Sequence, residues 1–192
     1  TNAAKLRALL RFADSMESKD ATSDEIAAAA DEFARGTDNM RLHRQMFAAN
    51  RLLFKKMALP KVLELMQSAI SGVDSALDVP NPSAAVMADE LYESRQYAFS
   101  QNLVLNVADV PRQTLSAVLR GRIEDIAGQT LLQQNNTASA IVKFKRALSV
   151  LPEKSAFSRA SSWHLGEALL VEGKEKEALE AYIRGYDQDF PD

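Results

Sequence analysis

Hydrophobic residues recur every three or four positions along nearly the whole chain, which is the period of an amphipathic α-helix. Over residues 3–17, one face of such a helix collects Leu6, Leu9, Leu10, Ala13 and Met16. Only residues 103–107 favour a strand, and that segment is short and isolated. The pattern therefore predicts an all-α protein without a sheet.

Capping and breaking residues divide this pattern into separate helices. Thr22 and Glu25 form a capping box for a second helix, which ends at Gly36. Thr37 is expected to cap a third helix that runs to about residue 57, and Pro60 lies at the start of a fourth. Further helices are expected over residues 82–105, 111–134, 137–150, 156–172 and 174–186.

The strongest break in the chain is the segment of residues 78–82, which contains two prolines. Because the residue before a proline avoids helical geometry, a helix ends here and another begins. We expect an N-terminal segment of about four helices over residues 1–79 and a second helical part over residues 80–192. The two parts are expected to form one continuous body.

Two stretches in the last third of the chain match each other position by position. Gly128, Ala140, Phe144, Ala147 and Pro152 recur as Gly166, Ala178, Tyr182, Gly185 and Pro191, and the first four pairs are offset by 38 residues. Small residues allow paired helices to approach closely, and an aromatic ring is expected to fill the gap between neighbouring units. Such a period indicates stacked helical repeats and not an enzyme pocket.

Over residues 121–191 this arrangement resembles the tetratricopeptide repeat, a helix–turn–helix unit. The family repeat has about 34 residues, so about four residues are inserted around residues 153–156. About four residues make one helical turn, which leaves the buried face in place. The resemblance implies helix pairs stacked as a right-handed solenoid, preceded by irregular antiparallel helices. It also implies a non-catalytic scaffold or adapter that binds a peptide or protein in a concave groove.

The groove positions of that family correspond to one set of residues in each unit of this chain. They are Arg122, Asp125, Gln129, Leu132 and Gln133 in the first unit, and Trp163, Glu167, Leu170 and Val171 in the second. An exposed Trp163 would anchor a peptide, because aromatic anchors dominate interface energies. The alternative is that Trp163 packs in the core against the preceding long helix.

A basic stripe is expected along the third helix. Its members Arg41, Arg44, Arg51 and Lys55 follow one another at spacings of three, seven and four residues. This stripe is either a contact surface for an acidic partner, an anionic lipid surface or a phosphate, or a solvated helix face. In the second case, acidic residues of neighbouring helices such as Asp31 and Glu32 balance its charge.

Composition narrows the classes of function. The 192 residues carry a net charge of −3, which disfavours nucleic-acid binding. Cysteine is absent and only His43 and His164 could serve as imidazole ligands, so we expect no metal site, no cofactor and no catalytic residues. No apolar run is long enough to span a membrane, which predicts a soluble protein, either cytoplasmic or exported with its signal segment removed.

Two alternatives remain open. The chain begins with Thr1 instead of Met, which fits a processed end or a piece of a longer protein. It would then be a helical accessory domain of a larger, exported, thioredoxin-like protein. Otherwise it is a helical enzyme or small-ligand-binding domain, with a site between the N-terminal helices and the repeats. A large enclosed apolar pocket would favour the last class.

Overall fold

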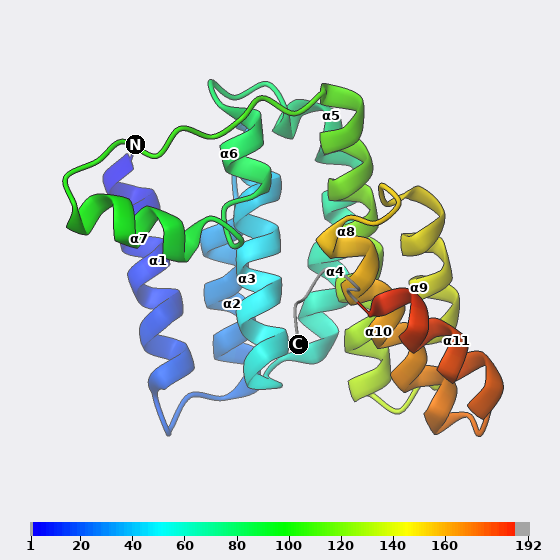
Figure 1. The fold of residues 1–192 in the computed structure, drawn as a ribbon. Coiled ribbons are helices and arrows are strands. Elements are labelled where there is room, and N and C mark those ends of the chain that lie inside the picture. The colour runs from blue at the N-terminus through cyan, green and yellow to red at the C-terminus, as the bar shows by residue number, and fades with distance from the viewer. Residues whose placement is uncertain (1, 187–192) are drawn as a thin grey trace.

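The computed structural model describes residues 2–186, and within this range it contains helices and turns but no strand (Figure 1). In chain order the elements are α1 (Asn2–Glu17), α2 (Ser23–Ala34), α3 (Arg41–Lys55), α4 (Leu59–Ala69), the 3₁₀ turn η1 (Ile70–Gly72), α5 (Val73–Ala76), α6 (Pro82–Val86), α7 (Tyr92–Ser100), α8 (Arg112–Gln133), α9 (Thr137–Val150), α10 (Ala156–Val171) and α11 (Glu175–Gly185). The prediction of an all-α protein is confirmed.

The N-terminal helices begin at residues that cap them. The Thr22 hydroxyl accepts the backbone N–H of Glu25 at 3.2 Å, and the Glu25 carboxylate accepts the N–H of Thr22 at 2.8 Å, so the predicted capping box is present. Pro60 lies in the first turn of α4, as expected. The third helix begins at Arg41, and Thr37 does not cap it. The Asp38 carboxylate accepts the N–H of Met40 at 3.1 Å, which makes a turn before the helix.

The expected helix over residues 82–105 is wrong, because the structure has two shorter helices there. α6 ends at Val86, and α7 begins after five intervening residues, at Tyr92. Arg122 of α8 donates a hydrogen bond of 2.7 Å to the carbonyl of Val86, and Arg95 donates one of 2.9 Å to the carbonyl of Ala84. These two arginine side chains donate to backbone carbonyls that would accept hydrogen bonds within the helix if α6 continued.

The buried face of α1 agrees in part with the predicted one, because Met16 is buried and Leu9 packs against the core. Phe12 is fully buried, and its ring stacks on that of Phe33 in α2 with 6.0 Å between centroids. Leu6 and Leu10, which were expected on this face, are 56% and 54% exposed. Hydrophobic spacing alone was therefore wrong for Leu6 and Leu10, because the position of Phe33 on the neighbouring helix decides which side of α1 is covered.

A continuous hydrophobic core runs from α1 to α8 across the proline-rich break. On α8, Leu119, Ile123 and Ile126 belong to the same cluster as Leu52 of α3 and Val62 of α4. Figure 1 shows α4 and α8 between the helices α1–α3 and the helices α9–α11. α8 therefore connects the two expected parts of the chain, since one side of it packs on the N-terminal helices and another on α9.

The last four helices form two pairs, α8 with α9 and α10 with α11, and α10 also packs on α9. The ring of Phe144 lies directly over Gly128, and that of Tyr182 lies over Gly166. The sequence led us to expect each ring in a gap between neighbouring pairs. Each ring also fills the space over the glycine of its own pair. The turns use left-handed residues, Asn135 at φ +62° and Gly173 at φ +74°. Pro191 of the repeat pattern lies outside the described residues.

Candidate functional site

A small pocket with a mixed polar and apolar lining lies where α10, α8 and the N-terminal helices meet. It has a volume of about 200 Å³, and its polar lining consists of Asn50, Glu90, Arg122, Asp125, Gln129, Ser161 and His164. The cavity thus brings together three predicted groove residues of the first unit. It also adds His164 and Ser161, which the repeat pattern did not indicate as site residues.

Asp125 is the centre of this cluster and is almost completely buried. Its carboxylate accepts hydrogen bonds of 2.7 Å from Ser161 and from Gln129, and Nδ1 of His164 lies 3.1 Å from both of its oxygens. Burial alone would lower the pKa of His164, but the bond to Asp125 and the charge of Glu167 outweigh burial and raise it. The cluster therefore favours an imidazolium paired with a carboxylate.

Arg122 joins three parts of the chain. Besides its bond to the carbonyl of Val86, it forms an ion pair of 2.9 Å with Asp89, and Glu90 lies 3.7 Å away. Its Cζ atom lies 5.0 Å from the centre of the Phe157 ring in α10. Because the guanidinium is bonded on its edges and stacked on its face, it fixes α10 and the end of α6 against α8.

The N-terminal helices lie against the groove positions of the first unit. Nε2 of Gln133 donates to the carbonyl of Leu53 in α3 at 3.4 Å, and α3 and α4 pack directly on α8. Arg122, Asp125, Gln129 and Gln133 are therefore all engaged in contacts within the chain. The physical reason is that the apolar side of α8 needs a cover, and the N-terminal helices supply it.

The groove positions of the second unit lie on an open side of α10. Trp163 is 50% exposed, Leu170 is 53% exposed, and Glu167 is exposed as well. The ring of Trp163 rests on that of Tyr182 in α11, with 4.8 Å between centroids. Trp163 is thus half open to solvent, and the aromatic ring that it contacts belongs to α11 instead of the long helix before it. The predicted groove is divided into a closed first half and an open second half.

Two exposed apolar side chains beyond the predicted groove residue Leu170 were missed by sequence reasoning. Leu179 on α11 is 60% exposed and Tyr186 is 64% exposed. Tyr186 follows the end of α11 in an extended conformation, so its spacing of seven residues from Leu179 does not place it on the same helix face.

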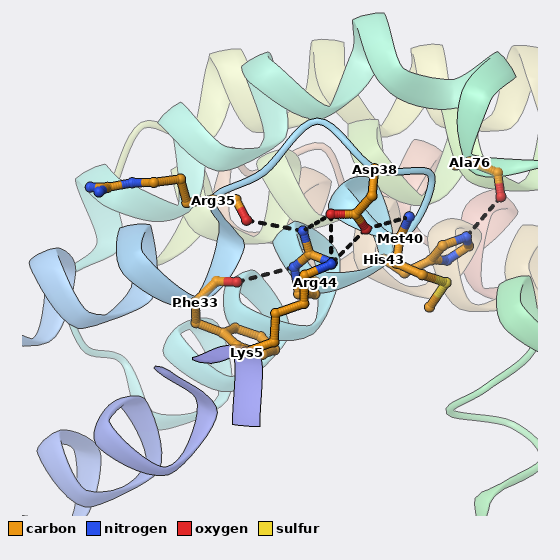
Figure 2. Close-up of polar contacts among 8 residues, drawn as sticks. All are labelled: Lys5, Phe33, Arg35, Asp38, Met40, His43, Arg44 and Ala76. Carbon is orange, nitrogen blue, oxygen red and sulfur yellow. Dashed lines mark hydrogen bonds and ion pairs between the residues drawn. The ribbon is translucent and has the colours of Figure 1, made fainter. Parts of the chain in front are cut away.

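The basic stripe on α3 does not form one open surface. Arg44 is buried and donates hydrogen bonds of 2.9 and 3.0 Å to Asp38, with further bonds to the carbonyls of Phe33 and Arg35, as Figure 2 shows. Its hydrogen bonds, assisted by Lys5, hold the pKa of Asp38 well below the usual range. The role of Arg44 is therefore to fix the turn between α2 and α3.

The other stripe residues also have partners within the chain. Lys55 pairs with Glu17, Arg51 lies over the ring of Phe47 at 5.2 Å, and Arg41 donates to the hydroxyl of Ser68 at 3.0 Å. The expected acidic partners, Asp31 and Glu32, instead pair with Lys61 and Arg11. The acids that pair with stripe residues are thus Glu17 of α1, with Lys55, and Asp38 of the turn before α3, with Arg44, and both differ from those expected.

Within residues 2–186, no group of three or more histidine and acidic side chains is arranged to hold a metal ion. No helix of this range is both long and apolar enough to cross a membrane. No family model, curated protein or solved structure matches the chain, so its own geometry carries the functional argument.

Proposed function

We propose that this chain is a non-catalytic protein-binding module, a scaffold or adapter that takes up a peptide or protein on the open side of α10. The observation that carries the proposal is the state of Trp163, which is half exposed while its ring rests on Tyr182 at 4.8 Å. An aromatic side chain already held in place loses little entropy on binding. Exposed tryptophans of this kind often dominate the energy of an interface.

A tetratricopeptide-like arrangement is part of this proposal. It is supported by the two helix pairs, in which a glycine on the first helix lies under an aromatic ring of the second, as Gly128 does under Phe144. A right-handed solenoid of such pairs would place Trp163, Glu167 and Leu170 on its binding side. The intramolecular partners of Arg44 and Lys55 favour a protein partner over a nucleic acid, since these cations are already paired.

A small-ligand or enzymatic role has one observation in its favour, the small pocket around Asp125 and His164. Its volume of about 200 Å³ is below the roughly 300–1,000 Å³ of typical ligand pockets. The groups that would contact a ligand also already bond one another. Protein binding is therefore the better-supported function.

The test uses the full chain and a displayed library of random peptides. Selected peptides are titrated against the wild type and Trp163→Ala, with isothermal calorimetry as the readout. Loss of the anchor should weaken binding by about tenfold or more, in the range of interface hot spots. The melting temperature should change little, because half of the side chain is in solvent.

The matched control is Val142→Ala, which removes an apolar side chain that is 49% exposed on α9. It should leave both affinity and melting temperature unchanged. A selection that yields no binder, or binders that ignore Trp163, would contradict the proposal. So would a fall of many degrees in the melting temperature of Trp163→Ala, since that would make Trp163 a structural residue.

A further inference from the structure

A groove lies between the end of α2, the start of α3 and the outer side of α4. Its volume is about 570 Å³, which lies within the roughly 300–1,000 Å³ of small-molecule sites. Arg35 follows the end of α2, Arg41 is the first residue of α3, and Ser68 lies in the last turn of α4; all three line the groove. The groove therefore brings together polar side chains from three helix ends.

Hydrogen-bond donors gather around Ser68. Arg41 donates to its hydroxyl oxygen at 3.0 Å, and the side-chain amide of Gln45 donates to the same oxygen at 3.1 Å. Gln45 lines the groove but is only 4% exposed, so the packing of α3 on α4 holds this arrangement in place. Because the oxygen already accepts two N–H groups, the hydroxyl hydrogen is left to donate. Among residues 2–186 it has no acceptor.

Two guanidinium groups at this end of the groove have no acidic partner in the part of the chain that the structure describes. Arg41 bonds only the hydroxyl of Ser68. The side chain of Arg35 extends away from the cluster of Asp38 and Arg44, and only its backbone carbonyl is bonded, as Figure 2 shows. These two arginines thus differ from Arg44, whose charge Asp38 answers.

The acidic residues of the groove lie further along it. Asp31 precedes Arg35 by one helical turn on α2, and Glu64 precedes Ser68 by one turn on α4. Both carboxylates bind Lys61, which lies 2.9 Å from Asp31. The acids are therefore held by a cation of their own, and the end of the groove at Arg35 and Arg41 presents donors and positive charge.

We propose that this end of the groove binds the phosphate group of a small soluble molecule. The phosphate oxygens would accept hydrogen bonds from the two guanidinium groups and from the hydroxyl of Ser68. Arginine suits this anion because its planar guanidinium donates two parallel hydrogen bonds. The remaining volume holds the rest of the ligand. Since the groove lies on the N-terminal helices and not on α10, this is a second binding activity, independent of the proposed protein binding.

The probe is inorganic phosphate, titrated into the isotope-labelled full chain at constant ionic strength and followed by NMR. We expect saturable shifts of the backbone amides of Gly36, Thr37 and Ser68, which line the groove. Acetate at the same ionic strength should bind more weakly, because it offers fewer acceptor oxygens and less charge. Arg35→Gln and Arg41→Gln should each raise the Kd for phosphate about tenfold or more, the usual effect of losing a hydrogen bond to a charged group.

The matched control is Arg146→Gln, which removes the same charge from an exposed position of α9 outside the groove. It should bind phosphate like the wild type. Arg35→Gln is the decisive variant, because the Arg35 side chain makes no contact within residues 2–186 whose loss could unfold the protein.

Absence of a saturable shift overturns the proposal, and so does an equal loss of affinity in Arg35→Gln and Arg146→Gln. Acetate that binds as tightly as phosphate overturns the assignment to a phosphate group. Binding to vesicles of anionic lipid that needs Arg35 while inorganic phosphate causes no shift would assign the groove to a membrane surface and overturn a soluble ligand. Trp163→Ala should bind phosphate normally, so a failure of the peptide test and a failure of this test are distinguishable.

Discussion

The ring of Phe144 occupies the space that a side chain on Gly128 would need. A Cβ atom on Gly128 would lie 2.6 Å from Cε1 and 2.8 Å from Cδ1 of that ring. Gly166 stands in the same relation to Tyr182, with 2.6 Å to Cε1. The glycines of the two pairs are thus positions of close helix approach, which the matched spacing in the sequence indicated.

Gly128→Ala should destabilise the protein. Forcing extra volume into a packed core costs about 1–3 kcal/mol, whereas alanine gains roughly 0.5–1 kcal/mol over glycine in a helix. The first effect should dominate because Phe144 is fully buried and cannot move aside. Gly166→Ala should cost less, since Tyr182 is partly exposed. Urea unfolding of both variants measures the difference.

The matched control for this prediction is the background Phe144→Leu, which removes the ring. Gly128→Ala should lower the free energy of unfolding by less in this background than in the wild type. The difference between the two costs is the coupling energy of a double-mutant cycle. Equal costs in the two backgrounds would show that the ring is not the cause.

The pKa values of the two histidines should be shifted in opposite directions from the ordinary value of 6.5. Burial, with the nearby charges of Arg122 and Arg44, lowers the pKa of His43, despite its bond of 2.9 Å to the carbonyl oxygen of Ala76. Asp125 raises the pKa of His164. In an NMR titration of the imidazole resonances, His164 should therefore protonate at higher pH than His43.

Asp125→Asn removes the charge partner of His164 and should lower the pKa of that imidazole. Because the folded-state pKa of His164 is raised, its contribution to stability is complete below pH 6.5 and is lost as the pH rises through the folded value. The wild type should therefore lose stability relative to Asp125→Asn in that upper range. Identical pH profiles for the two proteins would contradict this pairing.

Asp38 should contribute to acid stability. Its pKa is held below the ordinary value of 3.8 by the hydrogen bonds from Arg44, so its contribution is complete above pH 3.8. It is lost as the pH falls through the folded value. Asp38→Asn should lower the melting temperature at neutral pH, and the difference from wild type should shrink under acid conditions.

Asp14→Asn on the exposed side of α1 provides the control for Asp38. It should change the melting temperature little at either pH, because the Asp14 carboxylate lacks a partner of the kind that Arg44 gives Asp38. A difference between Asp38→Asn and wild type that stays constant down to strongly acid pH would contradict the ion-pair explanation.

Local chemistry made much of the fold predictable. The capping box of Thr22 and Glu25, the proline at the start of α4 and the glycine at position 173 all act within a few residues of where they stand. The helices α8 to α11 were predicted to within about two residues for the same reason.

Contacts between distant segments were not predictable. Arg122 ends α6 by bonding Val86, which is 36 residues away, and Asp125 finds His164 at a separation of 39 residues. Arg44 turned inward because the carboxylate of Asp38 and two carbonyls needed a donor. Spacing along a helix gives the side on which a charge lies, but the neighbours of that side decide whether the charge faces solvent.

α8 is covered by the N-terminal helices on one side and by α9 on another. A helix pair inserted before α8 would have to displace Leu119 and Ile123 from the main core. The first helix of the matched pairs is thus shared with the N-terminal part, so neither part can be exchanged for a foreign segment unless that segment covers α8 in the same way.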